Sequence, residues 1–360
     1  MVNNVYLFGA GVSQGTVPLV SETCDALKAM LVEMRWVRTV LVGKENNVYH
    51  TSLINRFDRI FEFVVELDSV LSNANYPLTP DEWAKRLYHS ESPKFHELRK
   101  VLSLFYTWHQ RTAPICPRLE HWAHELIDGD AGQFPAHSLV LSWNYDWQLE
   151  AVCGKALNAK SGLDPNPPRC LFLRKWDKSI TQKQLCDDPT FKVFKLNGDA
   201  FWLHPAMAGF SEKIIGTATP ETSVIEFWKK TISEIVDLEG KREGEVSCAL
   251  SYAFHDASQT EDFFGAIENC IGNATNLTVA GYSFPQANQQ WDAKIFAAMK
   301  QLKTIIVYNL PSQRESLLDS ISYLLANVGR SSPVIQFINA GKGLYDRIPV
   351  MRFPHQSQSI

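Results

Sequence analysis

Glycine residues follow the first apolar segment of the chain in an order that suits phosphate binding. Val5–Phe8 is rich in aromatic and β-branched residues and predicts a buried strand, which ends at Gly9, Ala10 and Gly11. A helix-compatible stretch, Leu19–Met34, follows shortly after. A strand, a glycine turn and a helix can together present backbone N–H groups and a positive helix end to a phosphate. The spacing is not G-x-G-x-x-G, however, and a tight turn between a core strand and a helix explains it equally well.

Amide and carboxyl side chains follow two further predicted strands. Asn144 and Asp146 come directly after the apolar segment Ser138–Ser142, and Asn197 follows Phe191–Leu196. Open α/β sheets bind ligands at the carboxyl ends of parallel strands, so these three residues are candidate site residues. The alternatives are structural: Asp146 as the N-cap of a helix, Asn144 as an amide that satisfies a loop, and Asn197 as part of a hairpin turn with the next glycine.

Strands and helices alternate regularly in the last part of the chain, and this alternation predicts the fold. The expected strands are Asn276–Ala280, Thr304–Tyr308 and Pro333–Phe337. The expected helices are Thr260–Ile271, Gln289–Leu302 and Ser312–Asn327. Such alternation is typical of a parallel, doubly wound sheet. We therefore predict a single Rossmann-like α/β domain over residues 1–350.

Three other segments interrupt or extend this domain. Residues 50–128 show helical spacing of apolar side chains, as at Phe57 and Ile60, and predict a helical insertion beside the carboxyl edge of the sheet. Residues 155–257 are interrupted by prolines, so we expect an irregular and partly helical middle segment. The polar residues 354–360 predict a loose tail.

The composition argues against several classes of protein. The 360 residues are 45% hydrophobic and carry a formal net charge of −4, which favours a globular protein without a broad nucleic-acid-binding surface. No apolar run reaches about 18 residues and no signal-peptide pattern precedes the first strand, so we expect a cytoplasmic protein without a membrane span. The seven cysteines are scattered, and His121 and His124 have no evident third ligand, so we expect no disulfide framework and no metal site.

Four separated motifs, and one further asparagine, occur in the order in which one known family has them. The motifs are Gly9–Ser13 with Gly15 and Pro18, Trp143–Asp146, Lys195–Asp199 and Gly281–Phe284, and the asparagine is Asn309. They resemble, in turn, the opening motif of the sirtuins, their strand-end Asn-x-Asp, their Lys/Leu-His-Gly, their Gly-Thr-Ser and the asparagine that ends the following strand. The "NYD" and "GYSF" wording resembles the divergent prokaryotic branch, whose members are often NAD-depleting anti-phage proteins.

The resemblance implies NAD as the bound substrate and a role for each matching residue. It implies that the NAD diphosphate lies against Gly9, Ala10, Gly11 and Ser13. It implies that Asn144 holds the nicotinamide ribose or positions a water at C1′, and that Asp146 supports the nicotinamide pocket. It implies that phosphate and ribose contact Gly281 and Ser283, and that the adenosine ribose contacts Asn309. These roles suit the chemistry, because glycosidic cleavage develops oxocarbenium character at C1′ and requires a positioned ribose and controlled water.

Asn197 departs from the family, because it occupies the position of the histidine general base. An amide can hydrogen-bond a ribose hydroxyl but cannot take its proton near pH 7. His204 is the nearest substitute along the chain. Three explanations stay open: an engineered replacement of histidine, a branch that cleaves NAD with Asn144 and a water, or a domain that binds a nucleotide without turnover. The four-cysteine zinc module of deacylating sirtuins is absent, which disfavours a protein deacylase.

The resemblance therefore predicts an NAD glycohydrolase of prokaryotic anti-phage defence, slowed or inactive because of Asn197. The alternative is a non-catalytic sensor or scaffold that binds NAD or ADP-ribose within a defence complex. An ordinary dinucleotide oxidoreductase is disfavoured, because Asp25 and Glu33 lie inside a helical pattern and do not supply the expected ribose carboxylate. An uncontrolled NADase would kill its own cell, so we expect a homo-oligomer or a partner protein, of ATPase or Argonaute type, and no direct contact with nucleic acid or membrane.

Overall fold

The fold is given by a computed structural model, which describes most of the chain. The described residues are 2–19, 22–43, 48–73, 79–111, 113–127, 132–161, 170–173, 182–202, 224–237, 248–250, 252, 257–330, 333–340 and 347–350. His204, parts of the middle segment 155–257 and the whole tail 354–360 lie outside them.

Seven parallel strands form the central sheet, as the alternation of strands and helices predicts. In spatial order they are β3 (Cys170–Leu173), β4 (Phe191–Lys195), β2 (Ser138–Ser142), β1 (Asn4–Phe8), β7 (Asn276–Ala280), β8 (Thr304–Asn309) and β9 (Val334–Asn339). The chain builds the sheet on one side of β1 first and then crosses to the other side. This order confirms the Rossmann-like, doubly wound prediction. The sequence does not predict β3, whose four residues follow a proline-rich stretch.

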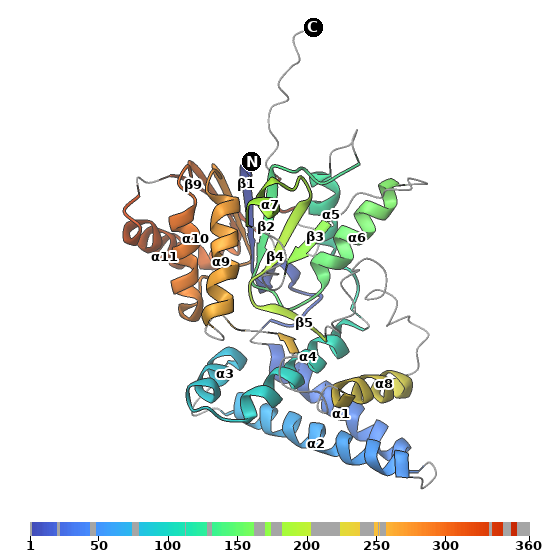
Figure 1. Cartoon of the computed structure of the whole chain (residues 1–360). Coiled ribbons are helices and arrows are strands. Elements are labelled where there is room, and N and C mark those ends of the chain that lie inside the picture. The colour runs from blue at the N-terminus through green and yellow to red at the C-terminus, as the bar shows by residue number, and fades with distance from the viewer. Residues whose placement is uncertain are drawn as a thin grey trace.

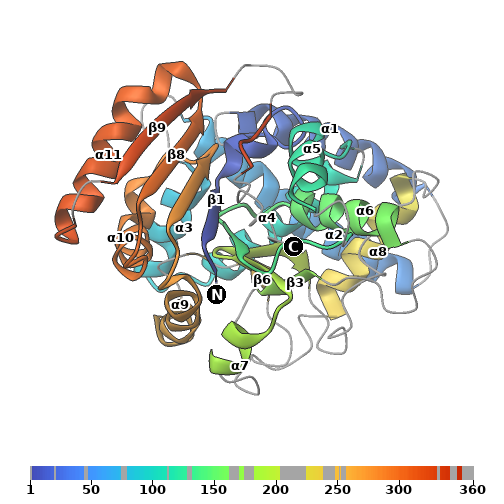
Figure 2. The same ribbon diagram turned by 90° about the horizontal axis from the view of Figure 1, so that it is seen from above.

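Helices cover both faces of this sheet. Figure 2 shows α9 (Ala257–Ile271), α10 (Gln289–Ala298) and α11 (Arg314–Asn327) on one side, and α5 (Pro117–Leu126) and α6 (Gln148–Ser161) on the other. The short α7 (Gln182–Asp187) joins the first group. Side chains alternate along β1, so that Val5 and Leu7 enter the first core while Tyr6 and Phe8 enter the second. On that second face the Phe8 ring lies 5.0 Å from the ring of Trp122.

A second group of helices lies at the carboxyl ends of the strands, below the sheet in Figure 1. This helical unit consists of α1 (Thr23–Val42), α2 (Val48–Leu71), α3 (Pro80–His89), α4 (Lys94–Gln110) and α8 (Val224–Asp237). It has its own core, in which the rings of Phe57 and Trp228 lie 5.8 Å apart. Its bounds differ from the expected insertion 50–128, because α1 and α8 belong to it while α5 packs on the sheet through Trp122.

One carboxylate links three helices of the helical unit. Glu33 of α1 accepts hydrogen bonds from the indole N–H groups of Trp108 (2.9 Å) and Trp228 (2.7 Å). It also accepts one from the guanidinium of Arg111, at the end of α4 (3.0 Å). Glu33 is therefore a structural residue inside the helical unit, in agreement with its place in a helical pattern.

A small antiparallel pair, β5 (Gly198–Trp202) and β6 (Cys248–Leu250), joins the sheet to the helical unit. Arg99 of α4 donates to the carbonyl oxygen of Leu250 over 2.7 Å. β5 follows β4 along the chain, but β4 pairs with β2 and β3 whereas β5 pairs with β6. The hairpin interpretation of Asn197 is therefore wrong, and the residue lies in a turn between two different sheets.

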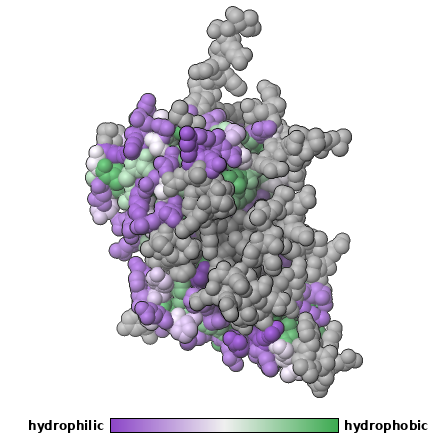
Figure 3. Space-filling view, in the orientation of Figure 1, coloured by the Kyte–Doolittle hydropathy of each residue, from purple (hydrophilic) through white to green (hydrophobic). Residues whose placement is uncertain are grey.

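The coloured surface in Figure 3 is mostly hydrophilic, with apolar residues in small patches. Among the residues that the structure describes, the exposed large apolar side chains are Val32, Trp36, Val42, Val65, Tyr323, Val334 and Ile338. Within the described part of the chain, no helix combines the length and the apolar character that a membrane crossing requires.

Candidate functional site

A cavity of about 1210 Å³ lies between the carboxyl edge of the sheet and the helical unit. Segments that follow β1, β2, β4, β7 and β8 line it, together with α3 and α4. Nine of the ten site residues predicted from the sequence belong to this lining: Gly9, Ala10, Gly11, Asn144, Asp146, Asn197, Gly281, Ser283 and Asn309. The cavity lies where the strand order reverses, which is the usual ligand site of a doubly wound sheet.

Glycines allow the loops after β1 and β7 to touch backbone to backbone. The N–H of Gly9 donates to Ala280 (3.0 Å), and the N–H of Gly11 donates to the carbonyl of Gly281 (2.9 Å). A Cβ on Gly9 would lie 2.6 Å from the Gly281 oxygen, and Gly281 itself has a φ of +60°. The glycines are thus required by loop packing, and the Gly9 and Gly11 N–H groups already have protein acceptors.

Ser13 is the predicted site residue that does not line the cavity. It ends the short 3-10 helix η1 (Ala10–Ser13) and is fully buried beside Val12. Its carbonyl accepts hydrogen bonds from the hydroxyl of Thr16 (2.8 Å) and the N–H of Val17 (3.0 Å). The turn directs Ser13 into the protein, where its Oγ has no hydrogen-bond partner in the described part of the chain. The contact between Ser13 and a phosphate stays a prediction.

Arg118 is a lining residue that the sequence does not single out. It is the second residue of α5, and its side chain is only 5% exposed. Its guanidinium donates to the carbonyl oxygens of Gly11 (3.0 Å) and Val12 (3.5 Å), and so holds the glycine loop from the side of the cavity. A single arginine near the start of a helix carries no local signal of such a position.

Two buried amides face the cavity with polar atoms that have no hydrogen-bond partner in the described part of the chain. Neither the Nδ2 nor the Oδ1 atom of Asn144 has one, although the side chain is only 3% exposed. The Nδ2 of Asn197 donates to the carbonyl of Trp143 (3.2 Å), which leaves its Oδ1 without a partner. Buried polar groups are normally satisfied, so these atoms indicate a site for a ligand with donors and acceptors of its own.

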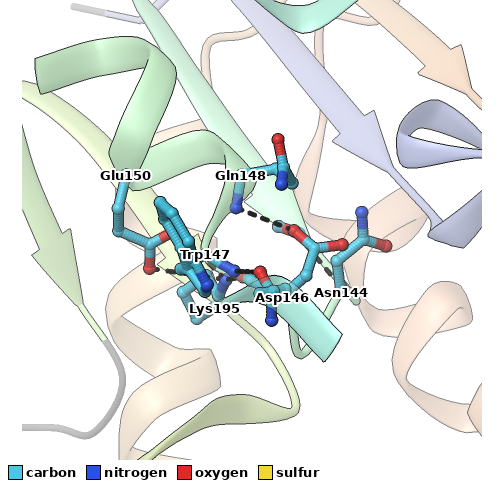
Figure 4. Close-up of polar contacts among 8 residues, drawn as sticks. Asn144, Asp146, Trp147, Gln148, Glu150 and Lys195 are labelled. Atoms are coloured by element: carbon cyan, nitrogen blue, oxygen red, sulfur yellow. Dashed lines mark hydrogen bonds and ion pairs between the residues drawn. The ribbon is translucent and has the colours of Figure 1, made fainter. Parts of the chain in front are cut away.

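Asp146 has both a structural contact and a place in the cavity. Its Oδ1 accepts the N–H of Gln148 (3.1 Å), the first residue of α6, so Asp146 has a structural contact but lies one residue before the N-cap position that the alternative assigns to it. The fully buried Lys195 donates to the Asp146 carbonyl and to the carboxylate of Glu150 (3.4 Å). In Figure 4, dashed lines join Asp146 to Gln148 and Lys195, and none ends on the amide group of Asn144. Lys195 therefore fixes the loop that carries both candidate residues.

Asn309 joins the loops after β7 and β8. Its Nδ2 donates to the carbonyl of Tyr282 (3.1 Å), and its Oδ1 accepts the N–H of Leu310 (2.8 Å). Ser283, in contrast, is exposed and lines the cavity without a buried environment. Asn309 thus orders the rim of the cavity through protein contacts, whereas Ser283 is accessible from solvent.

A buried carboxyl group supports the same rim. The hydroxyl of Tyr282 donates to the carboxyl oxygens of Asp292, at 2.9 and 3.1 Å, and the Nδ2 of Asn288 donates to that hydroxyl (3.1 Å). Burial raises the pKa of Asp292 to about 8, and the hydrogen bond with Tyr282 acts in the opposite direction. The Tyr282 ring stacks on Trp143 with a centroid separation of 6.1 Å, so Asp292 supports a ring between two lining segments.

The helical unit contributes a carboxyl group to the cavity. Asp81 of α3 accepts a hydrogen bond from the hydroxyl of Tyr145 (2.9 Å), the residue between Asn144 and Asp146. Burial raises the pKa of Asp81, the hydrogen bond with Tyr145 lowers it, and the neighbouring Glu82 raises it. The sequence does not predict this contact, which ties the helical unit directly to the loop after β2.

Among the described residues, no group of three or more His, Cys, Asp or Glu side chains could hold a metal ion. The described lining of the cavity offers amides, carboxyl groups and one buried guanidinium. No protein-family model and no curated protein sequence matches this chain.

Proposed function

We propose that the chain binds NAD in this cavity and hydrolyses the bond between nicotinamide and ribose. One NAD⁺ and one water give nicotinamide, ADP-ribose and a proton. The proposal combines the resemblance of the motifs to the sirtuins with the geometry of the residues that carry those motifs. Nine of the ten residues lie around one cavity.

The observation that carries the proposal is that the amides of Asn144 and Asn197 have polar atoms without hydrogen-bond partners among the described residues. The polar atoms of Asn144 and the Oδ1 of Asn197 are buried, face the cavity and have no partner among the described residues. Amides donate and accept hydrogen bonds, and vicinal ribose hydroxyls do the same. A ribose between these amides would satisfy atoms that the protein leaves without partners.

The size of the cavity supports an extended ligand. Its volume of about 1210 Å³ lies above the usual range for small-molecule pockets, roughly 300–1,000 Å³. A dinucleotide fits that size better than a single nucleoside. Asp146 lines the same cavity as the amides, and its carboxylate would stabilise the positive charge that develops on the ribose during cleavage.

Asn197 sets the expected rate. General-base catalysis contributes about 10²–10⁴-fold in rate, and an amide does not supply it. We therefore expect slow hydrolysis that depends on Asn144 and a bound water. The same substitution favours a second candidate, a non-catalytic sensor or scaffold that binds NAD or ADP-ribose in the same cavity.

The resemblance to the prokaryotic branch carries the biological part of the proposal. In that role the protein depletes NAD in the cytoplasm during anti-phage defence. Its activity would then be controlled by assembly into a homo-oligomer or by a partner protein of ATPase or Argonaute type.

The direct test is nicotinamide release from NAD by the purified chain. Asn144→Ala is expected to abolish release, because it removes both of the side-chain atoms that we assign to the ribose. Asn197→His is expected to raise release at least about tenfold, a threshold set below the general-base contribution of about 10²–10⁴-fold. The matched control is Asn269→Ala on the exposed surface of α9, which should leave release unchanged.

The outcomes separate the two candidates. NAD binding measured by calorimetry, without release in either the unaltered chain or Asn197→His, would favour the sensor. Release that survives Asn144→Ala would refute the assignment of the amides, and a chain that neither binds nor cleaves NAD would refute both candidates.

A further inference from the structure

We propose that Arg118 binds the diphosphate of the dinucleotide, in place of the N–H groups of the glycine loop; this inference rests on the proposed function. The glycine loop is the segment to which the resemblance assigns the diphosphate. The geometry of the loop and the charge of the cavity both point to the guanidinium beside it.

Most N–H groups of the glycine loop are already used in hydrogen bonds within the protein. The N–H groups of Gly9, Gly11 and Val12 donate to the carbonyls of Ala280, Gly281 and Gly9, at 2.9–3.0 Å. Ser13, the last residue of η1, is buried and does not line the cavity. A phosphate that used these N–H groups would have to break the packing between the loops after β1 and β7.

Arg118 lies where the diphosphate is expected. It contacts the carbonyl oxygens of Gly11 and Val12, lines the cavity and is 5% exposed. Its place at the start of α5 is fixed by Pro117, which begins the helix, and by Trp122, which packs on β1. A guanidinium carries five N–H donors in a planar fork, so it can hold the loop and contact a phosphate at once.

The charges around the cavity favour a role for Arg118 in binding an anionic ligand. The lining includes three carboxyl groups, those of Asp81, Glu82 and Asp146, while its cationic side chains in the described chain are Arg118 and Lys85. Lys85 is exposed on α3, where water screens its charge. A diphosphate carries two negative charges, and the buried arginine is the lining group that can offset one of them inside the cavity.

The test compares ligands with and without a diphosphate. The affinities of ADP and of adenosine are measured by calorimetry for the unaltered chain and for Arg118→Gln. ADP affinity is expected to fall at least about tenfold, because charge-assisted hydrogen bonds to phosphate are lost. Adenosine affinity is expected to stay within about twofold. Lys85→Gln is the matched control and should change ADP affinity by less than about threefold.

A second variant covers the possibility that Arg118→Gln loosens the loop. Arg118→Lys keeps the charge but loses the planar fork. It should therefore weaken ADP binding, relative to adenosine binding, by a smaller factor than Arg118→Gln does. Thermal unfolding without ligand shows whether each variant is folded. Three results would overturn the inference. They are an equal loss of ADP and adenosine affinity in a folded variant, an unchanged ADP affinity in Arg118→Gln, and no ADP binding by the unaltered chain.

These results are independent of catalysis. ADP binding that depends on Arg118, in a chain that does not cleave NAD, would refute the proposed hydrolysis and leave this inference standing. NAD cleavage by a chain whose ADP affinity does not change in Arg118→Gln would support the proposed hydrolysis and refute this inference.

Discussion

The contact between the loops after β1 and β7 can be tested by placing one methyl group in it. In Gly281→Ala, the new Cβ would lie 2.2 Å from the N of Val12 and 2.4 Å from the carbonyl carbon of Gly11. Both neighbours are backbone atoms, so no side-chain rotation can relieve the overlap. The two loops must separate, and the hydrogen bond from the Gly11 N–H to the Gly281 carbonyl (2.9 Å) is expected to break.

The expected loss of stability has three parts. Alanine at a φ of +60° costs about 1–2 kcal/mol relative to glycine. Overpacking costs about 1–3 kcal/mol, and the lost hydrogen bond about 1 kcal/mol. We therefore expect Gly281→Ala to lower the free energy of unfolding by roughly 3–6 kcal/mol.

Gly329 provides the matched control. Its φ of +64° is almost the same, but a Cβ there would meet no atom within 4 Å. Gly329→Ala should therefore show the backbone cost alone, about 1–2 kcal/mol. Both variants are measured by urea unfolding followed by circular dichroism. If they are destabilised to the same extent, the close packing of the two loops is not what requires glycine at position 281.

Two further predictions concern buried polar contacts around the cavity. Because burial raises the pKa of Asp292 from 3.8 to about 8, the folded chain keeps a proton that the unfolded chain releases, and the free energy of unfolding should fall as the pH rises between these values. Asp292→Asn should flatten that fall in urea unfolding across the same pH range, and an unchanged slope would show that other groups cause it. Tyr145→Phe removes the donor to Asp81 (2.9 Å) and should lower the free energy of unfolding by about 1 kcal/mol or more. Tyr323→Phe, at an exposed tyrosine of α11, should stay within about 0.5 kcal/mol, and equal effects of the two variants would contradict a stabilising role for the Asp81 contact.

The predictable part of this fold is the part with a strong local signal. β1, β2, β7 and β8 are apolar segments buried on both faces of a parallel sheet, and such segments stand out in the sequence. Because parallel strands all end at the same edge, polar residues after different strands must meet there. That geometric rule is sufficient to bring Asn144, Asn197 and Gly281 to one cavity without knowledge of any helix packing.

The unpredicted part depends on contacts between distant segments. The apolar stripe of α5 shows that the helix packs against something, but not that Trp122 packs on β1 while α8 packs on α2. The position of Ser13 is unpredicted for a different reason: a shift of one residue along η1 decides whether a side chain faces the cavity or the core. Arg118 and Asp81 are single charged residues on helices, and only the tertiary fold shows that they line the cavity.

The position of the helical unit bears directly on the candidate catalytic loop. Asn144 and Asp146 flank Tyr145, whose ring lies 5.6 Å from that of Tyr106 on α4 and whose hydroxyl donates to Asp81 on α3. From the other side, Lys195 holds the Asp146 carbonyl. The loop is therefore fixed between the sheet and the helices. A displacement of α3 must either break the hydrogen bond with Tyr145 or move the backbone that carries both site residues. Closely packed interiors transmit such shifts, so the geometry of Asn144 and Asp146 depends on the helical unit even though no helix supplies them.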